Sequence, residues 1–415
     1  MTRVVRALAL ALVVVQGGCS AVQVEFFPDD ESGDGGADLA IADARVPGDG
    51  APGDRAPDMV RGMDGGCLPT HLGDGNAEGC AASRAAALFR FALCSCETLA
   101  PDGEITTQAI DSSGGTAPPL RAAAIGTNGS VSCNMPLSIG GALYAASSVS
   151  TVGAVSVAES LRAGGSVQAA TNFTVGGDAW VAGSVAGPVA VAGTLSLPGG
   201  AQVSGGATAG NIVRMPVTVA PPCDCSVLPV ATLVAQHAGR NNDNATIHLE
   251  ASDYMEFDLH RGVELPCGAF YISGITASGE FTITAHGRAA LYIDGALTIG
   301  GALRIVIDPG AELDLFVSGA ITLNGGSLGD SQRPTALRIW DGSQGSLLLS
   351  GRPAIAGTLH APQAELHAPA GIDLRGPALV RDLRLDGSRL SLTYDRGLLS
   401  AGTRACGTRA ESPIP

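Results

Sequence analysis

The sequence contains no lysine, and all 24 of its basic side chains are arginine. Aromatic residues make up only 4% of its 415 positions, and the net charge is −15. Without clustered positive charge, an ordinary nucleic-acid-binding surface is excluded, because phosphate binding requires such clusters. Few aromatic residues and 58 glycines argue against an ordinary globular core. We expect a narrow, repetitive β architecture filled by small residues, valine and leucine.

Apolar runs long enough to cross a membrane are also missing. The run Ala7–Val15 has nine residues, whereas a transmembrane helix needs roughly 20. It follows Arg3 and Arg6 and precedes Gln16-Gly17-Gly18-Cys19, an order typical of an export signal. The sequence therefore predicts a signal peptide over residues 1–18.

The position of Cys19, directly after two glycines, resembles the lipobox of bacterial lipoproteins. This resemblance implies that Cys19 is lipidated and becomes the new N-terminus, although Gln16 stands where Leu or Val is usual. Ser20 follows, and not the Asp of an inner-membrane retention signal. The resemblance thus favours the outer membrane, with the protein facing the periplasm or the cell surface. The alternative is a soluble secreted protein with an ordinary cleavage site.

Residues 19–66 form an acidic segment. Between residues 21 and 66 there are eleven carboxylates and three arginines, with few large apolar side chains to offset the entropy of ordering. We expect a disordered tether behind the lipidated cysteine. A calcium-binding alternative for its Asp-Gly pairs lacks the spacing of a calcium loop. The sequence predicts no cofactor and no metal.

Nine cysteines follow Cys19. In an exported protein disulfides are the default, and an odd number leaves one thiol free or paired between chains. Two Cys-x-Cys pairs would also suit a four-sulfur metal site, but structural zinc more often uses Cys-x-x-Cys. We therefore expect disulfides, with the pairing undetermined. The expected disulfide cysteines are Cys67, Cys80, Cys94, Cys96, Cys133, Cys223, Cys225, Cys267 and Cys406.

A repeat of six residues defines the next part of the chain. Twelve consecutive sixth positions are apolar: Leu137, Leu143, Val149, Val155, Leu161, Val167, Phe173, Ala179, Val185, Val191, Leu197 and Val203. Each unit reads as a short strand and a tight bend, with one large side chain inward, and glycine supplies the bends. Three units close a coil of 18 residues. Residues 136–215 therefore form a β-solenoid, in which each residue of the repeat stacks on the one 18 positions away.

This array resembles the bactofilins, which are polymer-forming β-helical proteins, and more distantly the hexapeptide acyltransferases. An acyltransferase would need a catalytic histidine, and residues 136–215 contain none. Before the array, the segment Ala81–Leu93 reads as a helix. We expect a cysteine-rich, partly helical module over residues 67–135 to cap the first coil.

A second, looser array follows a cysteine-containing connection over residues 216–268. Its expected coil starts are Leu291, Leu313, Leu337, Leu359 and Leu379. Their variable spacing of about 22 residues favours a parallel β-helix over residues 269–400, followed by a tail over 401–415. The alternative is a β-sandwich, which would show more Asn-Gly-type turns.

Two motifs in this array resemble an uncharacterised β-helical domain of bacterial surface lipoproteins and of proteins similar to type IV pilus assembly proteins. They are Leu359-His360-Ala361-Pro362-Gln363-Ala364, where the family usually has Tyr-Ala-Pro-x-Ala, and Leu392-Thr393-Tyr394-Asp395, where it usually has His-Tyr-Asp. Upstream, Pro222-Cys223-Asp224-Cys225, Asn241-Asn242-Asp243-Asn244 and Leu265-Pro266-Cys267-Gly268 are similar to such lipoproteins too. The resemblance covers residues 222–400 and implies fold and location more than function.

Catalytic groups are hard to find in this sequence. Ser327 lies in a Gly-x-Ser-x-Gly, but no helix can follow it as a nucleophile elbow requires. His360 and His367 read as surface-loop residues, and Asn241–Asn244 as a turn. The candidates for a polysaccharide lyase or hydrolase site are Asp294, Asp308, Glu312 and Asp314, with Arg288 or Arg304.

Together these features predict an all-β protein: a parallel β-helix with a small cap and a disordered N-terminal tether. We expect no enzymatic activity. The predicted function is that of a surface-anchored structural or adhesive lipoprotein, bound to the outer membrane through its lipid. Envelope polysaccharide or other surface proteins are the partners considered. The alternative is a polysaccharide-binding or polysaccharide-processing β-helix. A carboxylate and arginine cluster in a groove beside the second array would favour that alternative.

Overall fold

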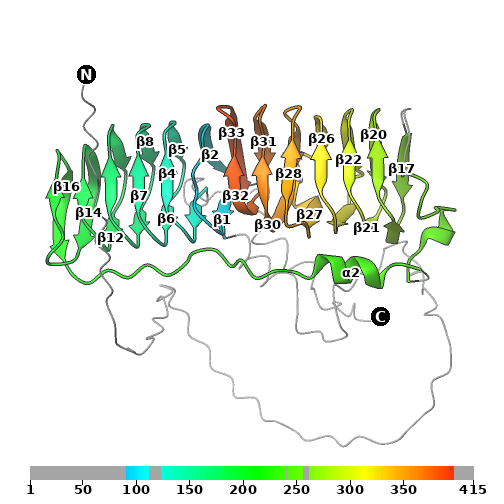
Figure 1. Cartoon of the computed structure of the whole chain (residues 1–415), viewed down its shortest axis with the longest axis horizontal. Coiled ribbons are helices and arrows are strands. Elements are labelled where there is room, and N and C mark those ends of the chain that lie inside the picture. The colour runs from blue at the N-terminus through cyan, green and yellow to red at the C-terminus, as the bar shows by residue number, and fades with distance from the viewer. Residues whose placement is uncertain (1–89, 112–122, 240, 256–260, 397–415) are drawn as a thin grey trace, which may run out of the picture. The chain divides into compact units, whose positions relative to one another are not determined.

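The computed structural model describes residues 90–111, 123–239, 241–255 and 261–396. They form a parallel β-solenoid of about 13 turns with very little helix (Figure 1). The pairings between strands are parallel throughout, and each turn contributes strands to three faces. The expected fold class, an all-β parallel solenoid, is confirmed. The expected signal peptide, tether and C-terminal tail lie outside the described residues.

The three faces differ in what lies against them. The base face consists of β1 (Leu93–Ser95), β3 (Ile125–Thr127), β6 (Leu143–Ala145), β9 (Leu161–Ala163), β12 (Ala179–Val181), β18 (Gly268–Ile272), β21 (Arg288–Ile293), β24 (Glu312–Val317), β27 (Leu337–Asp341) and the first parts of β30 (Thr358–His367) and β32 (Ala378–Arg384). The second face consists of β2 (Glu104–Ile110), β5 (Leu137–Ile139), β8 (Val155–Val157), β11 (Phe173–Val175), β17 (Arg261–Leu265), β20 (Phe281–Ala285), β23 (Leu303–Ile307), β26 (Gly326–Leu328), β29 (Ala354–Ala356), β31 (Ile372–Arg375) and β33 (Arg389–Asp395).

The third face consists of β4 (Val131–Cys133), β7 (Val149–Thr151), β10 (Val167–Ala169), β13 (Val185–Ala186), β15 (Val203–Ser204), β19 (Ile275–Ala277), β22 (Leu297–Ile299), β25 (Ile321–Leu323), β28 (Ser346–Leu349) and the ends of β30 and β32. Two longer strands, β14 (Val189–Leu197) and β16 (Thr208–Arg214), turn the corner between the second and base faces.

Helices are short in the described residues. They are α2 (Val230–Gln236) and the 3-10 turns η2 (Asn244–Thr246) and η3 (Pro334–Ala336). Of the helix expected over Ala81–Leu93, residues 81–89 lie outside the described part. Residues 90–92 form a bend and Leu93 begins β1, so the described end of that segment is not helical.

The first array has the interior that the six-residue repeat predicts. Leu137 pairs with Val155 and Val155 with Phe173, each 18 residues on. The three-residue strands bury their first and third side chains, such as Leu137 and Ile139. Each unit therefore points two side chains inward, and not the single one expected, because a strand alternates its side chains between its two sides.

The repeat shifts in the last complete coil. Phe173 pairs with Val189 and not with Val191, and Ala179 pairs with Leu195 and not with Leu197. The corner at Gly187 (φ +96°) and Pro188 is two residues shorter than the others. On the third face the spacing between paired residues is again 18, because Val203 pairs with Val185. Val191 and Leu197 stay buried because a shift of two residues preserves the inward direction.

The second array is a β-helix with a variable coil length, as expected, but its rows differ from those predicted. Leu313 pairs with Leu337 as expected. Leu291 pairs with Leu315, and Leu359 with Ile339, each two residues away from the predicted partner. Leu379 pairs with His360 and faces outward. Loops of unequal length between the faces account for these shifts.

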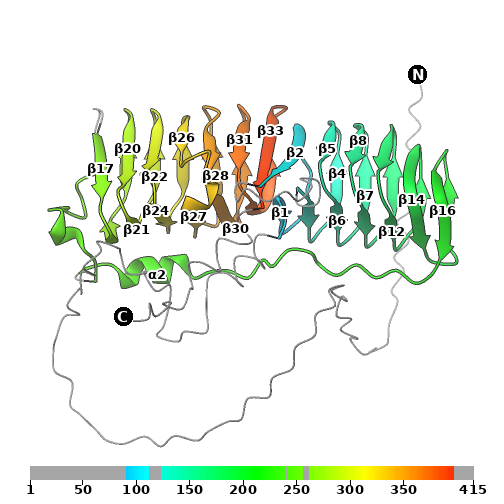
Figure 2. The ribbon, with the colours of Figure 1, turned by 180° about the vertical axis from the view of Figure 1, so that it is seen from behind.

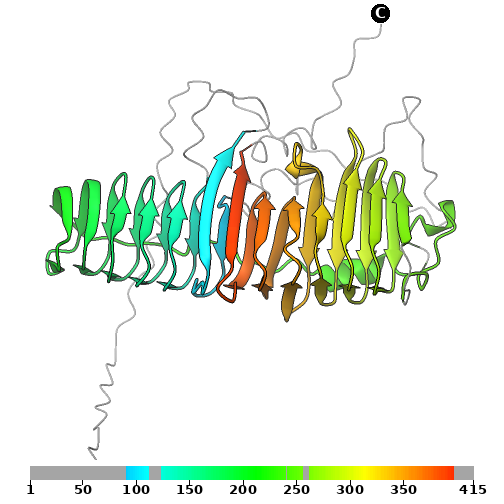
Figure 3. The same cartoon turned by 90° about the horizontal axis from the view of Figure 1, so that it is seen from above.

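The order of the two arrays along the stack is the reverse of their order in the sequence. The last strands of the second array, β32 and β33, pair with the first strands of the chain, β1 and β2. Figure 3 shows β2 and β33 side by side between the arrays. The expected cap over residues 67–135 is therefore wrong for its described part. Residues 90–111 and 123–135 form coils inside the stack, where both sides are covered by neighbouring coils.

Phe173→Ala tests the interior of the first array. Phe173 is fully buried between Val155 and Val189, and its truncation leaves a cavity that the stacked coils cannot close. We expect a loss of about 3–5 kcal/mol in the free energy of unfolding, measured by chemical denaturation. The control is Gln168→Ala on the exposed side of β10, which should change stability by less than about 0.5 kcal/mol. Equal effects of the two changes would contradict the interior row.

Candidate functional site

One extended segment, residues 215–238, crosses the base face, and we call it the strap. It leaves the end of β16, follows the base face along the stack and ends with α2 beneath the second array (Figures 1 and 2). Its side chains alternate: Val217 and Val219 are half-buried while Thr218 is exposed. Farther on, Cys223, Val230 and Val234 are buried against the base face. The strap thus packs as an extended chain on the outside of the solenoid.

The outward positions of the base face form one continuous row under the strap. In order along the stack, its members are Tyr271, Tyr292, Phe316, Trp340, His360, Leu379, Cys94, Gly126, Tyr144, Arg162 and Trp180. This row crosses the junction between the two arrays without a break. Its apolar members and the strap make a second hydrophobic cluster, separate from the solenoid interior.

Aromatic rings are stacked in the part of the row that α2 covers. The Tyr292 and Phe316 rings lie 4.9 Å apart and nearly parallel, and Phe316 and Trp340 follow at 6.0 Å. His237, just after α2, stacks on Tyr292 at 3.8 Å. Such contacts add to the burial of these large side chains. The stacked aromatic side chains of the row therefore help to keep the strap packed on the base face.

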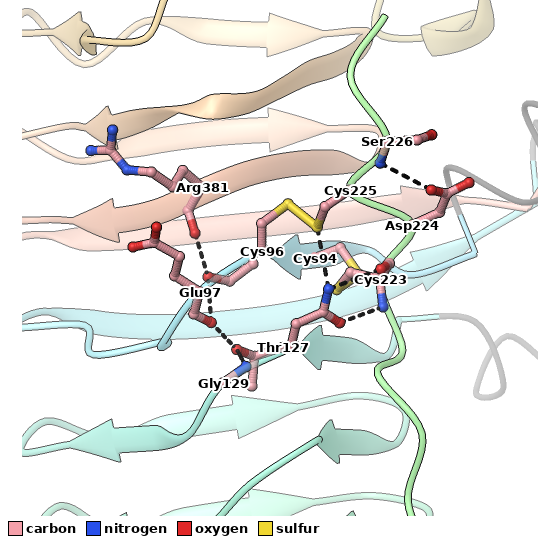
Figure 4. The surroundings of a disulfide bond; sticks show 12 residues. Cys94, Cys96, Glu97, Thr127, Gly129, Cys223, Asp224, Cys225, Ser226 and Arg381 are labelled. Carbon is pink, nitrogen blue, oxygen red and sulfur yellow. Dashed lines mark hydrogen bonds between the residues drawn. A yellow bond between two sulfur atoms is a disulfide. The ribbon is translucent and has the colours of Figure 1, made fainter. Parts of the chain in front are cut away.

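Two disulfide bonds fasten the strap to the middle of the stack (Figure 4). They join Cys94 to Cys223 and Cys96 to Cys225. Cys94 lies at an outward position of β1, and Cys96 follows two residues later. Because both the strand and the extended strap alternate their side chains with a period of two, a Cys-x-Cys on each side brings two sulfur pairs together. The spacing thus serves disulfides and not a four-sulfur metal site.

The neighbouring residues are fitted to these bonds. A Cβ atom at Gly126 would lie 3.0 Å from the Cys94 Sγ and 3.3 Å from the Cys223 Sγ, so glycine leaves the room they occupy. The Asn128 side chain donates to the Cys223 carbonyl at 2.9 Å and accepts from its amide at 2.9 Å. This amide side chain pairs with the strap as a neighbouring strand would.

The other cysteines have different outcomes. Cys267 is disulfide-bonded, as expected. Cys133, also expected in a disulfide, is instead a free thiol buried in β4, and burial raises its pKa to about 11. It faces inward beside Thr151 and acts there as a small apolar side chain. Cys19, Cys67, Cys80 and Cys406 lie outside the described residues.

Three of the polysaccharide-site candidates meet beside the strap. Asp314 is 1% exposed, and Arg338 donates to both of its oxygens, at 2.5 Å from Nε and 2.8 Å from Nη2. Arg338 also bonds Glu312 at 2.9 Å, and Arg288 lies 4.0 Å from the same carboxylate. Burial tends to raise the pKa of Asp314, but Arg338 outweighs it and the net shift is downward. The cluster exists, therefore, but as a buried ion-pair network.

The remaining candidates are not part of this cluster. Asp294 accepts from the Tyr271 hydroxyl at 3.0 Å, and Arg304 pairs with Glu280. Asp308 lies 2.7 Å from His286 Nδ1, and that contact raises the histidine pKa despite an opposing effect of burial. The structure thus divides the six predicted residues among separate ion pairs and hydrogen bonds, with only Glu312, Asp314 and Arg288 together.

The structure also locates three other residues that the sequence analysis considered. Ser327 is exposed on β26, and the next residues form a corner closed by the Arg333–Asp330 ion pair. Only the short 3-10 turn η3 follows, and not the α-helix of a nucleophile elbow. His360 was expected in a surface loop, but it is buried in β30 beside Trp340. His367 occupies another face, 2.7 Å from Asp386. The two histidines therefore do not form a pair.

One titratable residue was missed by the sequence analysis. Asp341 ends β27 at an inward-facing position and is buried, next to Gly342, whose missing side chain lets Val230 of α2 approach. Burial raises the pKa of Asp341 to about 6, although the hydrogen bond from the Ser343 amide at 2.8 Å opposes this. In the strand Leu-Arg-Ile-Trp-Asp the alternation places Asp341 on the inward side with Leu337 and Ile339, and only its charge argues against that position.

Similarity to known proteins is confined to one part of the chain. Residues 229–400 match the model of a family described as Domain of unknown function (DUF7305). The match begins beside α2 and includes the whole second array, but not the first array or the strap cysteines. No curated protein and no solved structure matches the chain.

The described part of the chain contains neither a metal-binding cluster nor a helix suited to span a membrane. Among those residues no group of three or more His, Cys, Asp or Glu side chains is arranged to hold a metal ion. None of the helices described there is long and apolar enough to cross a membrane.

The two strap disulfides should not act additively. Cys94–Cys223 spans 129 residues, and once it is closed, Cys96–Cys225 closes only a small ring. Replacing all four cysteines by alanine should lower the free energy of unfolding by about 5 kcal/mol, whereas removing only the half-buried Cys96–Cys225 bond should cost less than about 1 kcal/mol. Chemical denaturation of the two variants checks this. A loss from the single-bond variant of about half the loss from the four-cysteine variant would show that the bonds act additively, and would contradict this account.

Asp341→Asn should stabilise the protein in a pH-dependent manner. The folded pKa of about 6 lies above the usual 3.8, so ionisation penalises the folded state increasingly as pH rises from about 4 to about 6. Asparagine keeps an oxygen for the Ser343 amide and carries no charge. We expect the variant to be more stable by roughly 1–3 kcal/mol at pH 7. The difference should vanish at pH 4, and a gain independent of pH would contradict the assignment.

Proposed function

We propose that the protein is a structural, non-enzymatic component of the bacterial cell envelope, held at the outer membrane by a lipid on Cys19. It presents a rigid β-solenoid to envelope polysaccharide or to other surface proteins. The observation that carries this proposal is the continuous backbone ladder through about 13 turns, reinforced outside by a disulfide-bonded strap. Such a body resists bending because each coil is hydrogen-bonded to its neighbours.

The ion-pair network around Asp314 supports the same proposal. Its carboxylate is engaged by Arg338 through two bonds and by the Trp340 Nε1 at 3.3 Å. A general acid or base must instead be within reach of a substrate proton. In this proposal the arginine and carboxylate groups bind the coils together beneath the aromatic row.

The position of the chain's entry into the solenoid bears on how it would be presented. The described chain begins at residue 90, directly before β1, and β1 pairs with β3 on one side and β32 on the other. Figure 1 shows β1 within the stack. A lipid-anchored tether would therefore lead to an interior coil.

Metabolic labelling with a palmitate analogue tests the anchor. The wild-type protein should be labelled and fractionate with the outer membrane, because the thiol of Cys19 is the proposed acceptor. Cys19→Ser should lose the label and leave the membrane, and Cys133→Ser, at the free buried thiol, is the matched control that keeps both. Persistent labelling of the Cys19 variant would overturn the lipid anchor.

The non-enzymatic part has its own test. Purified protein should leave acidic polysaccharides at their original chain length, as measured by viscosity and reducing-end release. Depolymerisation that disappears in Asp314→Asn and persists in Asp373→Asn, an exposed carboxylate on β31, would replace the structural role by the polysaccharide-processing alternative.

A further inference from the structure

The two ends of the solenoid differ in what covers their outermost strands. At the β17–β18 end, the chain folds back and supplies hydrogen-bond partners to the outermost coil. Asp243 exchanges two bonds with Ala269, both at 2.7 Å, and the Asn244 side chain exchanges two with the backbone of Tyr271. Farther on, the carbonyls of Ala251 and Tyr254 accept from Ser273 and Thr276. The segment 243–254 thus covers β18 and β19 at this end, while β17 pairs, among the described strands, only with β20 and carries two exposed charged residues, Arg261 and Glu264.

The opposite end, formed by β15 and β16, has no such covering in the described residues. Strand β16 pairs with β14 on one side, and its other edge has no strand partner. Ile212 is 44% exposed there, as is Met215 directly after the strand. Natural edge strands are usually short or protected by proline, lysine or inward charges. Strand β16 has seven residues, and its one charged side chain, Arg214, turns back to the carbonyls of Pro198 and Ala201.

The composition of this end favours a second copy of the same chain as its partner. No charged side chain occurs from Trp180 to Val213. Two copies would therefore meet without charge repulsion, and a charged partner would find no complementary group. Pairing between the end coils of two arrays already occurs within the chain, where β2 and β33 pair along seven residues. The β16 edge has the same length.

We propose that two copies associate head to head, with the β16 edges pairing antiparallel about a two-fold axis. Such an isologous contact uses the same surface on both copies, and it places the exposed Ile212 and Met215 of each copy in the interface. At the other end of the stack, segment 243–254 covers β18 and β19, and the edge strand β17 carries Arg261 and Glu264, as protected edge strands do. The assembly therefore closes at two copies and does not continue into a filament. The proposal does not depend on the lipid anchor.

Sedimentation equilibrium of the full-length chain at micromolar concentrations tests this association. The wild-type protein should have the mass of a dimer. Ile212→Arg should dissociate it, with an affinity weaker by roughly tenfold or more, because two like charges would be juxtaposed across the axis. The matched control is Val306→Arg, since Val306 is 46% exposed on β23, far along the stack from β16. This variant should remain dimeric.

The melting temperature and circular dichroism of both variants establish that the solenoid is intact. A monomeric wild type, or a dimer that Ile212→Arg leaves unchanged, would overturn the β16 interface. Filaments longer than two copies would show that the β17–β18 end also associates, and would overturn the closure at two.

Discussion

Each coil of this solenoid takes its backbone hydrogen-bond partners from the coils beside it, and this requirement governs the rest of the structure. A coil without a neighbour has an unpaired edge, which is costly when buried and adhesive when exposed. The chain meets the requirement within the stack by pairing β2 with β33, and at one end by folding residues 243–254 over β18 and β19. The strap exists because the chain must travel from the β16 end to the opposite end before the second array can begin.

The repeating interior was predictable from the sequence because it has a local cause. A side chain every six residues faces inward when each unit is a strand and a bend, so the apolar positions from Leu137 to Val185 specify the stacked rows directly. The shift after Gly187 was not predictable, since a shortened corner that preserves the inward direction leaves the apolar pattern intact. In the second array, unequal loops displaced rows such as Leu291 with Leu315 by two residues.

The arrangement of the arrays and of the candidate site was less accessible. Strands β2 and β33 pair across a sequence separation of 285 residues, as between Gln108 and Thr393, and no local pattern indicates that contact. The two Cys-x-Cys spacings did indicate disulfides, but a pairing between Cys94 and Cys223 follows only once the strap is seen on the base face. His360 was misjudged because its outward position on the base face is covered by the strap, which lies far from it in sequence. Asp341 was missed because a carboxylate is not expected at an inward position of a strand.

The outward row of the base face, which the strap covers, is buried in the same way as the solenoid interior. The base face carries aromatic rings outward where an uncovered solenoid face would carry small polar residues, as on β5 and β8, whose outward residues are Ser138 and Ser156. The buried ion pair of Arg338 with Asp314 belongs to the same covered region. Both features depend on the strap to keep water away.

The first two described strands pair with the last two, β1 with β32 and β2 with β33, while the strap joins the two physical ends of the stack. In topological terms the chain is a circularly permuted solenoid. Joining the end of β33 to the start of β1 and cutting the strap would produce an ordinary solenoid with termini at opposite ends. In the natural connectivity a pull applied through residue 90 and one applied through residue 396 act on adjacent coils, so such loads would bypass both arms of the stack.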